Sequence, residues 1–162
     1  GSGVTTATNT WQLALKHDDL RLSGGGSIDL SKLADSSIDG LISELQFAPT
    51  ADASLVLDQP AGLKLGWSTP SSSPVAIELT PLKLSGGGKH FEAAGHLRWP
   101  QAGSLRVVAT NIATADLAGL LADPLPPVAV RGIVLNATWD QGPLLFNAET
   151  DVVWQQRLAG AV

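Results

Sequence analysis

Histidines and carboxylates are the side chains from which a metal site or general acid–base catalysis would be built, and this chain has three histidines and 15 acidic residues. The even spacing of His90 and His96 would place both on one face of a strand, but too far apart to share one ion. His17 lies far from both in sequence, and no cluster of carboxylates lies near His90 and His96. We therefore expect solvated side chains, with no metal site and no cofactor.

Acidic residues and serines are the groups from which the active site of a hydrolase would be built. A glycosidase needs two carboxyl groups in one cleft, and the sequence leaves such a pair open. Most acidic residues, however, lie at turns, as Asp18 and Asp19 do, or alternate with leucines, as Glu78 does. No Gly-x-Ser-x-Gly motif occurs. These patterns predict a protein that is not an enzyme.

The phrase Leu-Ser-Gly-Gly-Gly occurs twice, at 22–26 and at 84–88, which suggests an internal repeat of about 62 residues. A phosphate-binding loop would continue into Lys-Ser or Lys-Thr at the start of a helix. Neither copy does so: Lys89 follows the second copy, but a strand pattern comes next. A chain reversal, a bulge or a bend in a sheet is the expected role of each glycine run.

The chain has five tryptophans and no tyrosine. Most of them begin or end a predicted strand, which favours a place at the rim of an apolar core. A platform that stacks against sugars is the alternative, but such platforms commonly mix tryptophan with tyrosine. The tryptophans are Trp11, Trp67, Trp99, Trp139 and Trp154.

Short segments that alternate apolar and polar residues must position all of these side chains. Period-2 alternation predicts about eleven or twelve strands, without long helices between them, and hence antiparallel pairing. In the segment 41–47 it places Leu41, Leu45 and Phe47 on one face. Segments 130–139 and 144–154 are predicted to form a hairpin, because 140–143 reads Asp-Gln-Gly-Pro.

One segment departs from this alternation. Residues 114–122 space leucines at helical intervals, with Thr114 as N-cap, Asp116 in the first turn and Asp123-Pro124 as the stop. We expect a short α-helix there, and a weaker helical or turn candidate at 30–34. Residues 1–3, Gly-Ser-Gly, are typical of a cloning remnant, which leaves 4–162 as a single β-rich domain.

The composition and net charge of the chain argue against several classes of partner and site. Charged residues make up 15% of the chain, the net charge is −5 and the pI is near 4.9. These values argue against nucleic acid and against anionic lipid headgroups as partners. Without cysteine the chain can form neither a disulfide nor a thiolate metal site. No apolar run is long enough to span a bilayer.

The predicted fold is mostly β, an antiparallel curled sheet with one short α-helix, either an open trough (a β-taco) or a sandwich. Its apolar face would either pack into a dry core or offer a strip for a lipid acyl chain. The candidate residues of that face are Leu13, Leu15, Leu41, Leu45, Leu55, Leu57, Leu63, Leu65, Ile77, Leu79, Leu97, Leu105 and Val107.

Three short motifs give the chain a family resemblance. Residues 116–121 read Asp-Leu-Ala-Gly-Leu-Leu, residues 124–127 read Pro-Leu-Pro-Pro, and a strand pattern follows at 130–135. With these motifs, and over about 11–155, the chain resembles the AsmA/TamB superfamily of bacterial envelope proteins. The sequence pattern of the chain is also similar to that of type II secretion protein N.

The resemblance implies a segment of a longer, repetitive protein of a Gram-negative bacterium, facing the periplasm and anchored to the inner membrane outside this chain. Its apolar trough would shield phospholipid acyl chains during transport between membranes or in outer-membrane biogenesis, without a cofactor. One alternative is a secretion or outer-membrane assembly module that contacts envelope proteins, with sheet edges pairing with a client. The other is a carbohydrate-binding β-sandwich.

Overall fold

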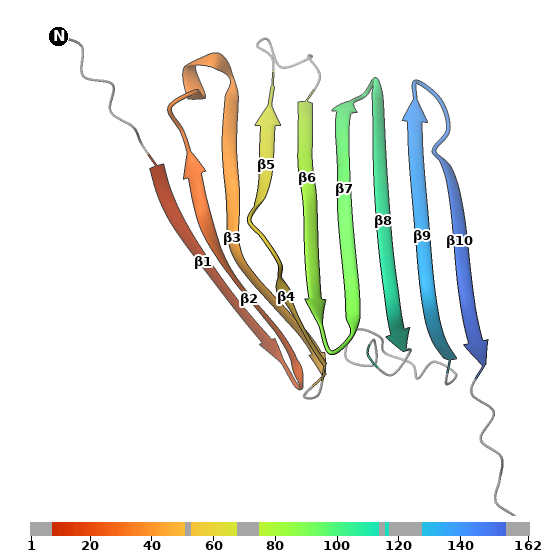
Figure 1. Ribbon diagram of the computed structural model, residues 1–162. Helices are drawn as coiled ribbons and strands as arrows, with labels where there is room; N and C mark the ends of the chain where they lie inside the picture. Colours follow the sequence, from red (N-terminus) through yellow and green to blue (C-terminus); the bar gives the residue numbers. More distant parts are fainter. Residues whose placement is uncertain (1–7, 51–52, 68–74, 114–115, 117–127, 155–162) are drawn as a thin grey trace, which may run out of the picture.

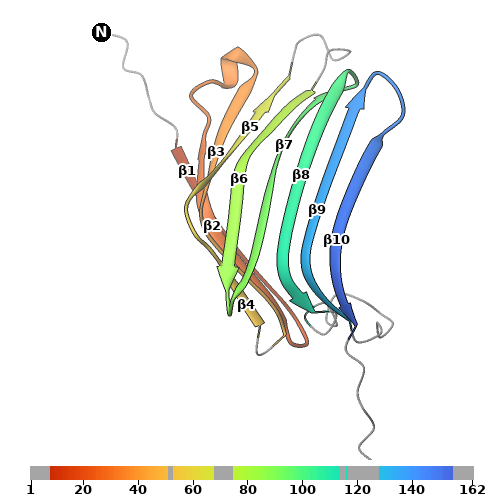
Figure 2. The same cartoon turned by 45° about the vertical axis from the view of Figure 1, so that its right-hand side comes forward.

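The computed structural model describes residues 8–50, 53–67, 75–113, 116 and 128–154, and these residues form a ten-stranded antiparallel sheet. The sheet is a single, curved layer (Figures 1 and 2). The strands are β1 (Thr8–His17), β2 (Leu20–Asp29), β3 (Ser37–Thr50), β4 (Ala53–Leu57), β5 (Ala61–Gly66), β6 (Val75–Gly86), β7 (Lys89–Trp99), β8 (Ala102–Ala113), β9 (Val128–Asp140) and β10 (Leu145–Trp154).

Strands that follow each other in sequence are also neighbours in the sheet, with one exception. Both β4 and β5 lie between β3 and β6, each pairing with a different part of these two long strands. Tight turns join several neighbours, including the predicted turn at Asp18-Asp19 and the hairpin of β9 and β10. The predicted mostly-β, antiparallel, curled sheet is confirmed.

The alternation at 75–79 and at 82–84 predicts two separate strands, and here the structure differs. Segments 75–79 and 82–84 belong to one strand, β6, which continues through Pro81 where its pairing with β7 shifts between Leu79 and Leu82. A proline lacks the N–H that a regular ladder needs, and the shift accommodates it. The predicted helix at 114–122 lies, apart from Asp116, outside the described residues. The candidate at 30–34 overlaps a 3-10 turn, Leu33–Asp35.

The two glycine runs serve different purposes. The first lies inside β2, where the register with β3 shifts between Gly25 and Gly26. In the second, Gly87 and Gly88 have φ of 58° and 76° and form the two-residue turn between β6 and β7. Positive φ at both central residues suits the twist of a hairpin, and glycine adopts it without strain. A bulge and a chain reversal were both among the expected roles.

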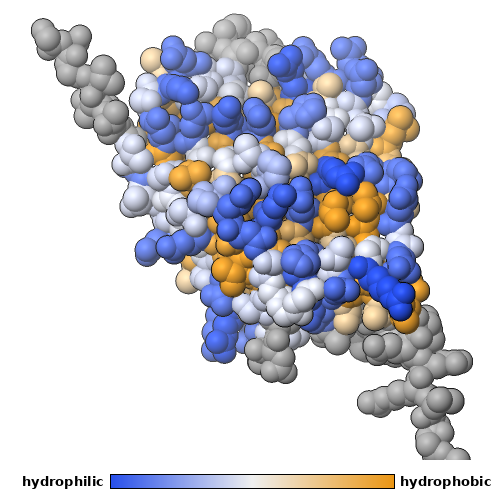
Figure 3. Space-filling view, viewed as in Figure 1, coloured by the Kyte–Doolittle hydropathy of each residue, from blue (hydrophilic) through white to orange (hydrophobic). Residues whose placement is uncertain are grey.

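Very little of the described chain is buried, because the sheet has no second layer among the described residues. The buried hydrophobic residues there are Leu55, Ala61, Leu84 and Ala109, and many larger apolar side chains remain exposed. Hydrophilic side chains cover much of the view in Figure 3, with apolar areas between them. A sheet with an uncovered apolar face is a candidate binding surface.

Candidate ligand-binding face

The strand registers define the two faces of the sheet, because directly paired residues on neighbouring strands point to the same side. One face, here called the apolar face, consists of rows of aliphatic residues that run across the strands. Two central rows are Leu63–Leu79–Gly95–Leu105–Ala137–Phe146 and Leu65–Ile77–Leu97–Gly103–Trp139. The opposite side, here called the polar face, carries the residues between them, such as Lys64, Glu78 and His96.

All of the candidate apolar-face residues except Leu41 lie on this face. Those on β1 to β4 extend it to the first edge of the sheet: Leu15 pairs with Leu22, which pairs with Phe47, and Phe47 pairs with Leu55. Their role in lipid binding stays a prediction.

The placement of Leu41 beside Leu45 and Phe47 is wrong. In the β2–β3 register, Gly25 pairs with Glu44 and Gly26 with Ile42, so that Ser43 is an extra residue in β3. This bulge turns Leu41 to the polar face, where it is 42% exposed, and Ile42 takes its place on the apolar face. Counting by twos across 41–47 assumed an unbroken strand.

A depression of about 370 Å³ lies in the apolar face over β6 to β9. Gly95, Gly103 and Ala137 form its floor, because their side chains are absent or small. Larger apolar side chains surround it, and the Cδ1 atoms of Leu97 and Leu105 lean over the glycines next to them. The depression is also lined by Ile77, Leu79, Trp139 and Leu144.

Sequence reasoning missed the floor and the tryptophan of this depression. Gly95 and Gly103 interrupt otherwise apolar strand patterns, a signal that a backbone is approached closely. The two glycines become neighbours only through the β7–β8 register, which pairs Gly95 with Leu105 and Leu97 with Gly103.

Tryptophans on this face pack against glycines and against each other. Trp11 lies over the first glycine run, with its Nε1 atom 2.9 Å from where a Cβ on Gly26 would stand. Trp99 and Trp139 meet at one end of the sheet in a T-shaped pair, with ring centroids 4.4 Å apart. These positions favour packing and rim roles, as expected from the sequence.

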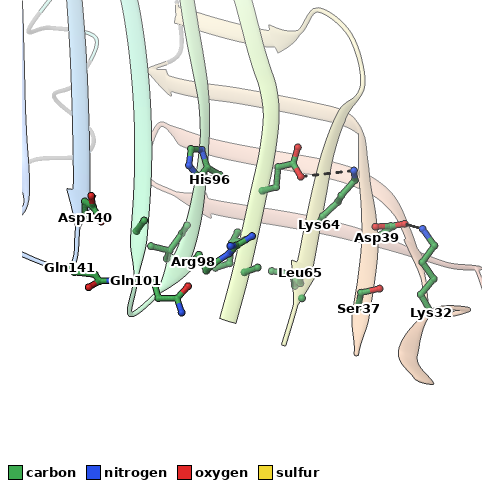
Figure 4. Close-up of a pocket in the computed structure, with 16 residues that line it drawn as sticks. Lys32, Ser37, Asp39, Lys64, Leu65, His96, Arg98, Gln101, Asp140 and Gln141 are labelled. Atoms are coloured by element: carbon green, nitrogen blue, oxygen red, sulfur yellow. Dashed lines mark hydrogen bonds and ion pairs between the residues drawn. The ribbon is translucent and has the colours of Figure 1, made fainter. Parts of the chain in front are cut away.

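The polar face has a larger hollow of about 750 Å³, which Figure 4 shows in close-up. Its charges alternate in sign along the cross-strand row Asp39–Lys64–Glu78, which His96 continues. Lys64 pairs with Glu78 at 4.0 Å, and the Nζ of Lys32 lies 2.6 Å from Asp39. Opposite charges so arranged satisfy one another, and the exposed ladder resembles an ordinary solvated face.

Hydrogen bonds and nearby charges shift the pKa values of two side chains at this end of the polar face. The pKa of Asp29 is lowered because its carboxylate accepts a hydrogen bond from the backbone N–H of Ser31. The pKa of Lys32 is raised because its ammonium group donates to the carboxylate of Asp39. His90 and His96 share this face, and the hydroxyl of Ser104 lies 3.0 Å from Nδ1 of His96.

Of the two hollows, the apolar depression is the better candidate for a ligand site. The polar hollow is larger, but most of the charged groups that line it are already paired, Lys32 with Asp39 and Lys64 with Glu78. Within the described ranges, no group of three or more His, Asp or Glu side chains could hold a metal ion. The same ranges contain no helix long and apolar enough to cross a membrane.

The chain was compared with protein-family models, with curated proteins and with solved structures. No match was found in any of the three comparisons, so that they assign no family to the chain.

Proposed function

We propose that this chain is a non-enzymatic part of an envelope-biogenesis protein and that its apolar face shields lipid acyl chains. One observation carries the proposal: the apolar face of a single-layer sheet is continuous and, in its central rows from Leu57–Leu84 to Leu65–Ile77, free of charged side chains. A carboxylate or ammonium group placed against hydrocarbon would be costly, and these rows offer none.

The dimensions of the face suit an acyl chain. Residues on one face repeat every two positions, about 7 Å along a strand, so that four rows span about 20 Å. That length exceeds the roughly 15 Å depth of one leaflet of a bilayer core. Each methylene that leaves water contributes about 0.8 kcal/mol, so that even partial covering of a chain is favourable.

The envelope setting rests on the resemblance of residues 116–121 and 124–127 to the AsmA/TamB superfamily. This resemblance adds inter-membrane lipid transport and a periplasmic location to the proposal. Fractionation of a Gram-negative host that produces the full-length protein tests the location.

Native mass spectrometry with lipid extraction tests acyl-chain binding. Leu105 and Arg106 are neighbours in β8 on opposite faces, and both are exposed, so that glutamate at either position is compatible with folding. We expect co-purified phospholipid in the parent chain and in Arg106→Glu, and its loss in Leu105→Glu. A folded parent chain with no lipid, and no uptake of added lipid, would refute the proposal.

The open edges of the sheet support a second candidate function, that of a secretion or assembly module. Neither β1 nor β10 has a strand on its outer side among the described residues. β1 pairs with β2 in unbroken register and contains no proline, and such an edge can accept a client strand. Binding of an extended peptide by a lipid-free chain, and loss of that binding in the variant Gln12→Pro, would favour this candidate.

A further inference from the structure

At one end of the sheet β6 begins, β7 and β9 end, and β10 begins (Figure 1). Exposed apolar side chains gather at this end. They are Val75, Trp99, Leu144 and Phe146, and together with the half-buried Trp139 they are here called the tip cluster. Leu144 is 63% exposed, Phe146 72% and Trp99 54%. The described turns at the opposite end present Asp18-Asp19 and Gly87-Gly88 instead.

The tip cluster is one continuous surface on the apolar face. Val75 pairs with Trp99, and Trp99 contacts Trp139 through the T-shaped ring pair. Trp139 and Leu144 line the apolar depression, and Phe146 pairs with Ala137 on its floor. The cluster therefore leads directly from solvent to the site proposed for acyl chains.

Polar groups of both signs border the cluster on the other face of the same end. Arg98 and Asp140 line the polar hollow there, together with the amides of Gln101 and Gln141 (Figure 4). Neither charged side chain forms an ion pair with another described residue. The other charged groups of that hollow, Lys32 with Asp39 and Lys64 with Glu78, are paired.

This combination matches a zwitterionic bilayer surface. A guanidinium group can bind a lipid phosphate, while a carboxylate and an indole ring can receive a choline. Tryptophan is enriched at membrane interfaces because its ring is apolar and its N–H is polar. The net charge of −5 opposes an anionic surface.

We propose that this end of the sheet docks on a zwitterionic lipid surface, with Trp99 and Phe146 entering the interface beside the apolar depression. The inference rests on the proposed function, because docking there would open the acyl-chain site toward the membrane from which a lipid leaves.

Flotation of the purified chain with phosphatidylcholine vesicles tests the docking. We expect the parent chain to float with the vesicles, and the double variant Trp99→Ser/Phe146→Ser to lose at least tenfold in the bound-to-free ratio. The matched control is Val56→Ser, since Val56 is 50% exposed but lies on the polar face, outside the tip cluster and the apolar face. The control should float like the parent. Circular dichroism confirms folding of all variants.

Two flotation results would overturn the proposal: a parent chain that stays unbound, or a control that loses binding as much as the double variant does. Uptake of monomeric lysophosphatidylcholine, read by native mass spectrometry, separates docking from acyl-chain binding. Uptake without flotation refutes docking and leaves the proposed function standing. Flotation that depends on the tip cluster, without uptake, refutes acyl-chain binding and leaves docking standing.

Discussion

Shortening Leu105 to alanine should weaken acyl-chain binding by a calculable amount. Leu105 lines the apolar depression, pairs with Gly95 and with Ala137, and is 43% exposed in the free chain. A ligand in the depression would cover that remaining surface. Full burial of a leucine side chain contributes about 1.5–3 kcal/mol, so that covering this share contributes about 0.6–1.3 kcal/mol.

Because 1.4 kcal/mol corresponds to a factor of ten in Kd, Leu105→Ala should weaken binding about three- to eightfold. Titration with a fluorescent fatty-acid analogue measures the change. Leu105→Glu should weaken binding further, since its carboxylate would lose water beneath the ligand.

Val108 supplies the matched control for this prediction. It lies on the same strand but on the polar face, where it pairs with Glu92 and Val134. Val108→Ala should leave the affinity unchanged, whatever it does to stability. Equal effects of Val108→Ala and Leu105→Ala, or no effect of Leu105→Ala, would refute the assignment of the ligand to the apolar face.

The remaining predictions concern the fold. Gly87→Val should cost about 1–2 kcal/mol in urea unfolding because φ is positive there, while Gly87→Asn should cost little; equal costs would contradict the turn geometry. Gly26→Ala should lower the free energy of unfolding by about 1–3 kcal/mol or more, since its Cβ would stand 1.9 Å from a backbone oxygen of β3. Gly132→Ala should be tolerated better, because there is open space beside Gly132. Asp29 should titrate below its ordinary pKa of 3.8, so that its small contribution to stability is present above pH 3.8 and lost as the pH falls through the lower folded value. An NMR titration checks this, and a normal pKa would contradict the hydrogen bond from Ser31.

Alternation and turn chemistry predict most strands of this fold. The β9–β10 hairpin follows from two alternating segments around Asp-Gln-Gly-Pro, since these turn residues interrupt the strand pattern. Alternation could not separate a sandwich from an open sheet, because an inward-facing leucine looks the same in both. Nor could it place Leu41, because a single extra residue at Ser43 reverses every side chain before it.

The apolar depression could not be predicted from the sequence, for a different reason. Its floor is made of missing side chains, and a gap between strands exists only once their register is known. Leu79, Leu97 and Leu105 were expected on one face from their own strands. The β7–β8 register then places Gly95 and Gly103 between them.

A spin-labelled fatty acid tests the central claim most directly, because its unpaired electron broadens the NMR signals of nearby methyl groups. The account predicts selective broadening of Leu63, Leu79 and Leu97 on the apolar face. The methyl signals of Val56 and Val134 on the polar face should stay sharp. Broadening of both faces alike, or of neither, would contradict an acyl-chain site on the apolar face.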